Sequence, residues 1–66
     1  MPKRVRDMIR LVEQDGWYQV RQTGSHRQYH HETKPGTVTI AGQEHVELVP
    51  KTERTILRQA GLQDER

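Results

Sequence analysis

Residues 17–40, WYQVRQTGSHRQYHHETKPGTVTI, decide the fold of this 66-residue chain. Three short runs rich in aromatic and β-branched residues are separated by a Gly-containing turn, TGS, and by a Pro-Gly turn, ETKPGT. Such runs joined by turns are typical of antiparallel strands connected as hairpins. The pattern predicts strands over about residues 17–23, 26–31 and 37–41.

Amphipathic helices are predicted on both sides of the strands. Apolar residues recur at spacings of three and four between Val5 and Val12, which indicates a helix over about residues 3–14. A second helix is predicted over about residues 52–60, with Thr52 as its N-cap. The order α-β-β-β-α predicts an α+β fold, in which two helices cover one face of a three-stranded antiparallel sheet.

The composition limits the class of protein. With 66 residues, of which 30% are hydrophobic, the chain is expected to form one domain, residues 1–66, around a thin core. It contains no cysteine, and therefore no disulfide and no thiolate metal site. The first residues, MPKRVRDMIR, are charged and no segment approaches the length of a membrane span. We therefore expect a cytoplasmic protein that does not contact membranes.

Charge is distributed unevenly along the strands. From Trp17 to His31 there are two arginines, three histidines and no carboxylate, although the chain carries nine carboxylates. Strand side chains alternate between faces, so Val20 and Tyr29 placed toward the helices send their neighbours outward. The predicted open face consists of Gln19, Arg21, His26, Gln28, His30, Thr37 and Thr39. A face of donors and cations without carboxylates suits a polyanion.

Several residues need a separate prediction. Trp17 is expected to begin its strand and pack on the first helix, and Trp17, Tyr18 and Tyr29 are all expected to be packing residues rather than base-stacking ones. Arg27 shares the side of Tyr29. It is therefore expected near a sheet edge, where its long stem can reach solvent.

The stretch GWYQVRQTGSHRQYHHETKPGTVTI, followed by ILRQAGL, resembles the HicA family of small toxins from bacterial toxin–antitoxin pairs over about residues 5–62. The resemblance implies a double-stranded-RNA-binding-domain-like fold, endonuclease activity on mRNA and a HicB-like antitoxin that covers the active surface. It implies contact with DNA only indirectly, through the antitoxin complex. The family's catalytic histidine lies in a Gly-Ser-His motif, which here is Gly24, Ser25 and His26.

RNA cleavage without a metal requires a group that takes the 2′-hydroxyl proton and positive charge beside the phosphate. Histidine, with an unperturbed pKa of about 6.5, suits this role. His26 is the predicted general acid/base, supported by Gly24 and Ser25. His30 shares the face but lies about 13 Å along the strand, too far for the same phosphate or a shared metal ion, and we expect no metal or cofactor. The candidate RNA-binding residues are Arg21, Arg27, Gln28, Lys51, Arg54 and Arg58.

Two alternatives stay open at the level of sequence. One is a non-catalytic RNA-binding module on the same fold, which would bind through shape and phosphate contacts. The other is a decayed toxin that acts only through its protein partner, because the segments AGQEHVELV and VPKT depart from the family pattern. The open face without carboxylates also predicts an acidic contact surface on the antitoxin.

Overall fold

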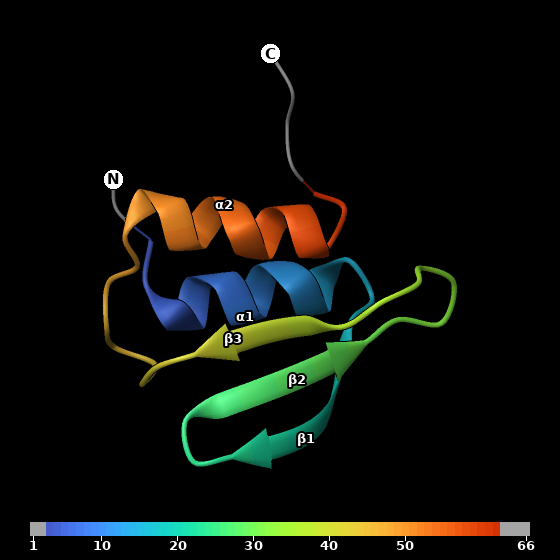
Figure 1. The fold of residues 1–66 in the computed structure, drawn as a ribbon, viewed down its shortest axis with the longest axis horizontal. Helices are drawn as coiled ribbons and strands as arrows, with labels where there is room; N and C mark the ends of the chain where they lie inside the picture. Colours follow the sequence, from blue (N-terminus) through green and yellow to red (C-terminus); the bar gives the residue numbers. More distant parts are fainter. Residues whose placement is uncertain (1–2, 63–66) are drawn as a thin grey trace.

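The computed structural model describes residues 3–62, which form two helices and one three-stranded sheet (Figure 1). The sheet is antiparallel throughout, with the spatial order β1-β2-β3. This architecture confirms the predicted α+β fold with the order α-β-β-β-α. The elements are α1 (Val5–Gln14), β1 (Tyr18–Thr23), β2 (His26–His30), β3 (Val38–Ala41) and α2 (Pro50–Gln59).

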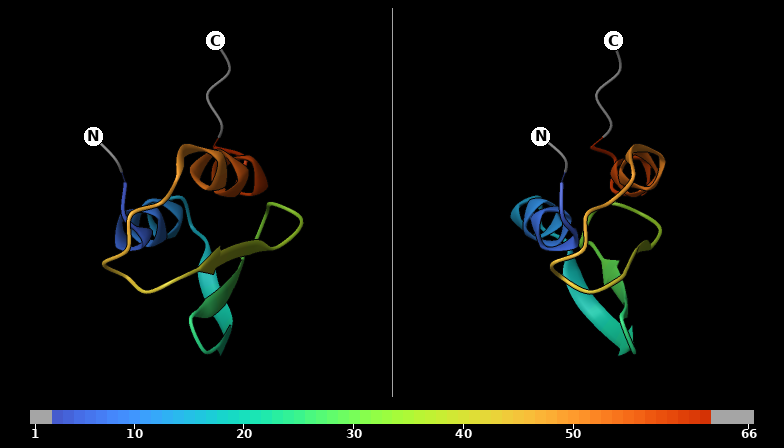
Figure 2. Two further views of the ribbon diagram at one scale, coloured as in Figure 1. Left: turned by 60° about the vertical axis from the view of Figure 1, so that its left-hand side comes forward. Right: turned by 90° about the vertical axis from the view of Figure 1, so that its left-hand side faces the viewer.

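Both helices lie on the same side of the sheet and pack against β3, so that the β1–β2 hairpin projects beyond them (Figures 1 and 2). All six residues of β1 are exposed, whereas β2 and β3 alternate between buried and less buried residues. The hydrophobic core therefore lies between the two helices and the inner face of β2 and β3. It consists of Val5, Met8, Val12, Trp17, Tyr29, Val38, Ile40, Ile56 and Ala60.

The second helix begins two residues earlier than predicted. Its N-cap is Val49, in an extended conformation, and Pro50 lies in its first turn. Proline suits this position because its φ is preset and its missing N–H would have no helical partner there. Thr52 lies inside the helix, so its predicted role as the N-cap is wrong. Within residues 3–62, neither helix is long and apolar enough to cross a membrane.

Strand β1 contains a bulge that breaks the predicted alternation. Gln19 pairs with Tyr29 and Arg21 pairs with Gln28, which leaves Val20 as an extra residue. Directly opposed residues share a face, so Gln19 lies on the helix side with Tyr29, and its predicted place on the open face is wrong. Val20 is 47% exposed, so its predicted burial against the helices is also wrong. No helix covers this projecting strand, so burial does not impose a strict alternation of inward and outward side chains on it.

Candidate active site

The β1–β2 turn is a two-residue loop made of Gly24 and Ser25. Thr23 pairs directly with His26, Gly24 has a φ of 59° and Ser25 has no positive φ, which is the pattern of a type II′ hairpin turn. A Cβ on Gly24 would meet no atom within 4 Å. The backbone conformation, and not a lack of space, therefore favours glycine at this position. The turn makes His26 the first residue of β2.

A buried arginine holds this turn from the helix side. The Ser25 carbonyl accepts hydrogen bonds from Arg27 Nη1 at 3.3 Å and from the Gly42 N–H at 3.1 Å. The same Nη1 donates to the Gly42 carbonyl at 2.9 Å, and Nη2 lies 4.0 Å from the Glu44 carboxylate. The residue directly before His26 is thus tied to the loop that follows β3.

The predicted place of Arg27 near a sheet edge is wrong. Arg27 lies on β2, the central strand, is 9% exposed and shares the helix side with Tyr29. It is buried there because the turn and loop carbonyls accept its hydrogen bonds, which offset the cost of removing its charge from water. Arg27 therefore positions the turn and does not face the open side of the sheet.

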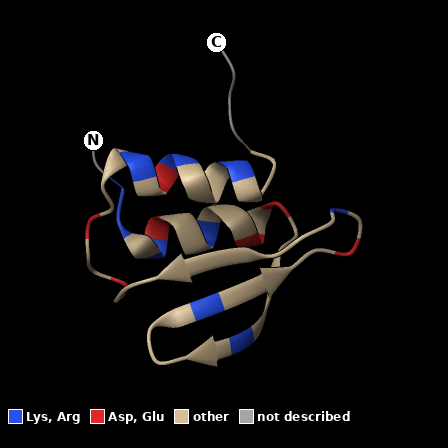
Figure 3. Cartoon of the chain, in the orientation of Figure 1, with Lys and Arg blue, Asp and Glu red and all other residues tan. Residues whose placement is uncertain are grey.

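The open face has three levels, each centred on an exposed residue of β2. From the turn to the base of the hairpin, the levels are Thr23–His26–Ala41, Arg21–Gln28–Thr39 and Tyr18–His30. The three strands contain no Asp or Glu, so this surface offers donors and positive charge to an anion (Figure 3). Thr37, also predicted on this face, precedes β3.

Tyr18 is a residue of the open face that sequence reasoning missed. It was expected in the core, yet it is 47% exposed and pairs with His30. Trp17, one residue earlier, is 2% exposed and packs as predicted. The only signal in the sequence was this adjacency, because alternation would have sent one of two neighbouring aromatic residues outward.

Arg21 is close enough to His26 to act on the same group. It lies one level further from the turn, on the neighbouring strand, and is therefore a diagonal neighbour of His26. Diagonal neighbours in an antiparallel pair lie about 7–8 Å apart, with their Cβ atoms somewhat closer, and a long arginine side chain spans this distance. The structure thus brings a histidine and an arginine together beside an exposed turn, a pairing that can bind and activate a phosphodiester.

The other candidate cations lie elsewhere. Lys51, Arg54 and Arg58 are exposed on α2, whose buried residue Ile56 faces the core. Because α2 lies on the helix side of the sheet, its Lys and Arg residues are separated from those of the hairpin (Figure 3). The structure therefore does not bring these three residues to the site of His26.

His31 directly follows β2, and both of its ring nitrogens form hydrogen bonds within the fold. Its Nδ1 accepts hydrogen bonds from the Thr33 and Lys34 N–H groups at 3.1 and 3.2 Å, so Nε2 carries the proton and donates to the Asp15 carbonyl at 2.7 Å. Its ring also packs edge-on against Trp17, with centroids 5.2 Å apart. Within residues 3–62, no group of three His, Cys, Asp or Glu side chains is placed to hold a metal ion.

Two titratable groups outside the open face are perturbed. A hydrogen bond from Lys34 lowers the pKa of the Asp15 carboxyl from its usual 3.8. Burial raises the pKa of Tyr29, whose hydroxyl has no hydrogen-bond partner among residues 3–62. Both groups belong to the helix side, so neither shift bears on the chemistry of His26.

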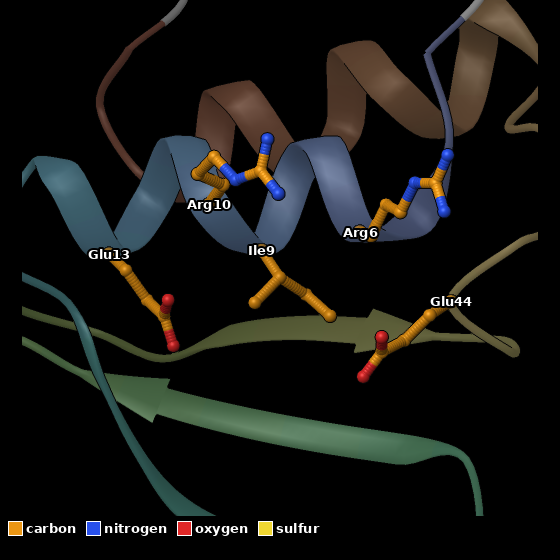
Figure 4. A pocket seen from close by; sticks show the side chains of 5 residues that line it. All are labelled: Arg6, Ile9, Arg10, Glu13 and Glu44. Atoms are coloured by element: carbon orange, nitrogen blue, oxygen red, sulfur yellow. The ribbon is translucent and has the colours of Figure 1, made fainter.

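A shallow pocket lies along α1, beside the loop that follows β3 (Figure 4). Charges of both signs and one apolar side chain line it, and it contains no histidine. Its two carboxylates make it less suited to a polyanion than the open face, which remains the candidate active site. The lining residues are Arg6, Ile9, Arg10, Glu13 and Glu44.

Comparison with known families gives a clear result. Residues 5–62 match the HicA toxin of bacterial toxin–antitoxin systems. The chain belongs to the HicA toxin family. The resemblance predicted from residues 16–40 and 56–62 is therefore confirmed, and the protein is the toxin of a toxin–antitoxin pair.

A solved structure supports the same assignment. A toxin–antitoxin complex from Streptococcus pneumoniae contains a chain that is 35% identical to this HicA-family protein, with a TM-score of 0.74. The match covers 92% of this chain and 100% of that chain. A comparison with curated proteins found no match.

Proposed function

We propose that this toxin is a metal-independent endoribonuclease that cleaves mRNA, with His26 as the general acid/base. The observation that carries the proposal is the position of His26. It is exposed at the start of β2, directly after a constrained turn, on a face without carboxylates and diagonal to Arg21. A histidine held beside a cation on such a surface provides both the base and the positive charge that RNA cleavage requires.

The reaction uses the nucleophile that RNA itself carries. The imidazole of His26 takes the proton of a 2′-hydroxyl, the 2′-oxygen attacks the adjacent phosphorus, and the bond from phosphorus to the 5′-oxygen breaks. Arg21 stabilises the charge that builds on the non-bridging oxygens. His30 lies about 13 Å along the strand, too far to protonate the leaving 5′-oxygen, which takes its proton from water or from an arginine. The products are a 2′,3′-cyclic phosphate and a 5′-hydroxyl.

The partner in this proposal is a HicB-like antitoxin that covers the open face. The similarity to a chain of a toxin–antitoxin complex supports a protein partner. The absence of Asp and Glu from all three strands favours a partner that supplies carboxylates to this surface. With mRNA and an antitoxin as partners, the protein acts in the cytoplasm and contacts DNA only through the antitoxin complex.

Cleavage of a labelled single-stranded RNA in EDTA tests the catalytic role. Purified toxin without antitoxin should cleave the RNA, and His26→Ala should reduce the rate by about 10²–10⁴-fold, the usual contribution of general acid–base catalysis. Mapping the product ends should show cyclic phosphates. Circular dichroism of His26→Ala should show an intact fold, because the residue is exposed.

Three outcomes would contradict the proposal. Cleavage by His26→Ala at the wild-type rate would show that another group is the base. Complete loss of cleavage in EDTA would show that a metal ion is required. Intact RNA with retained binding, in both proteins, would favour the non-catalytic RNA-binding module or the decayed toxin.

A further inference from the structure

The base of the open face carries two exposed rings that the proposed reaction does not use. Tyr18 and His30 are directly opposed on β1 and β2, and Tyr18 is 47% exposed. Opposed side chains in an antiparallel pair have Cβ atoms about 4.5–5.5 Å apart. The two side chains are therefore neighbours on the same surface as His26.

This surface is not explained by packing. The other two large aromatic residues of the chain, Trp17 and Tyr29, are buried in the core, which leaves Tyr18 outside it. An exposed aromatic ring beside cations, on a surface without carboxylates, is the combination that proteins use to bind single-stranded nucleic acid. The rings stack on bases, and the cations contact phosphates.

We propose that Tyr18 and His30 form a nucleobase-stacking subsite, so that the substrate of this toxin is single-stranded RNA. The inference rests on the proposed ribonuclease function and specifies its substrate class. A strand whose reacting phosphate lies beside both His26 and Arg21 runs along the hairpin toward the two rings. There an unpaired base lies against Tyr18.

The same geometry disfavours a duplex. Bases in an RNA helix are stacked on each other, so a protein ring reaches a base face only where the strand is unpaired. The order of the three levels places the reacting phosphate at the turn and the base contact at the opposite end of the hairpin. Loss of the subsite therefore weakens substrate binding without removing the catalytic base.

Equilibrium binding by the inactive protein tests the subsite. In the His26→Ala background, the affinity for a labelled single-stranded RNA should fall by about 5- to 150-fold with Tyr18→Ala, the usual effect of losing one base–aromatic stack. Tyr18→Phe keeps the ring and should keep the affinity. Because tyrosine is uncharged, the dependence of affinity on salt should not change.

Val20→Ala is the matched control, because Val20 lies on the same strand and is also 47% exposed. This variant should leave RNA affinity unchanged. A series of RNAs that each lack one base provides a second readout. Removing the stacked base should weaken binding to protein with Tyr18 but not to protein with Tyr18→Ala, whereas removing any other base should affect both equally.

The outcomes separate this inference from the proposed function. If wild-type protein cleaves RNA but Tyr18→Ala binds it as tightly as Tyr18 does, the subsite is wrong and the ribonuclease stands. Equal losses with Tyr18→Ala and Tyr18→Phe would also overturn it, since the ring is retained in the second variant. If no variant binds RNA and the wild type does not cleave it, the proposed function itself fails.

Discussion

Strand β2 presents two different surfaces. Arg27 and Tyr29 point to the helix side, where they are buried, whereas His26, Gln28 and His30 are exposed on the open face. The buried pair contacts the core and ties the turn to a loop, and the exposed set contains the candidate catalytic base. The comparison teaches that stability and chemistry in this small domain depend on alternate residues of one strand, so substitutions can separate them.

The largest effect on stability is expected on the helix side of β3. Ile40 is fully buried, and Ile40→Ala should lower the free energy of unfolding by about 2–5 kcal/mol, which combines lost burial with a cavity. Its neighbour Thr39 lies on the open face, opposite Gln28, and Thr39→Ala should change stability by less than about 0.5 kcal/mol. Urea unfolding of both variants measures the difference between the faces. Equal losses of unfolding free energy in the two variants would show that the open face contributes as much to stability as the helix side.

Substitutions of the two hairpin arginines test whether stability depends only on the helix side and RNA cleavage only on the open face. Arg27→Met should lower stability by about 1–3 kcal/mol, because it leaves the partly buried Gly42 carbonyl without its donor and removes a hydrogen bond to the Ser25 carbonyl. It should also slow RNA cleavage, since the turn before His26 loosens. Arg27→Met should therefore affect RNA cleavage although Arg27 lies on the helix side.

Arg21→Met is the matched control for that prediction. Arg21 is exposed on the open face, so its loss should leave urea unfolding unchanged. RNA affinity should fall, and the slope of log affinity against log salt should decrease by about one phosphate contact. An Arg27→Met protein that cleaves RNA at the wild-type rate would refute the positioning role of Arg27.

The turn itself is expected to show a smaller effect. Gly24→Ala should cost about 1–2 kcal/mol of stability, because alanine is strained at a φ of 59° although the space beside Gly24 is open. Gly24→Asn should cost less, since asparagine adopts this conformation more readily. Thermal unfolding of the two variants gives the comparison. Equal destabilisation by both would indicate that side-chain contacts, rather than backbone conformation, select glycine.

The sequence predicted the fold correctly in the elements whose buried residues recur at a regular spacing. The helix spacing in α1 and the alternation of Val38 and Ile40 were sufficient because those residues face the core. The open-face position of His26 followed in the same way, since Tyr29 on the same strand is buried and sets the alternation.

The predictions failed in the segments where no regular spacing of buried residues exists. Every residue of β1 is exposed, so alternation contained no information about the bulge at Val20 or the outward position of Tyr18. The burial of Arg27 depends on Gly42, fifteen residues away, whose carbonyl accepts its hydrogen bond. Sequence spacing alone does not reveal such a contact.

The smallest expected effect concerns a carboxylate on the helix side. Asp15 pairs with Lys34, which also donates to the Ala60 carbonyl at 3.2 Å and so links the ends of both helices. The hydrogen bond from Lys34 lowers the pKa of Asp15 in the folded protein below its usual 3.8. The pair therefore stabilises the fold above that pH, and the contribution is lost as the pH falls through the folded-state pKa.

Asp15→Asn should therefore lower stability by less than about 1 kcal/mol at neutral pH, as expected for a partly exposed ion pair. The urea-unfolding free energies of the wild type and the variant should converge as the pH falls through the folded-state pKa of Asp15, because the Asp15 carboxyl is then protonated and both side chains are uncharged. A difference that persists at the lowest pH would assign the effect to packing. RNA cleavage at neutral pH should be the same in both proteins, since Asp15 lies outside the open face. A change in cleavage rate would show that the charge of Asp15 affects catalysis by His26.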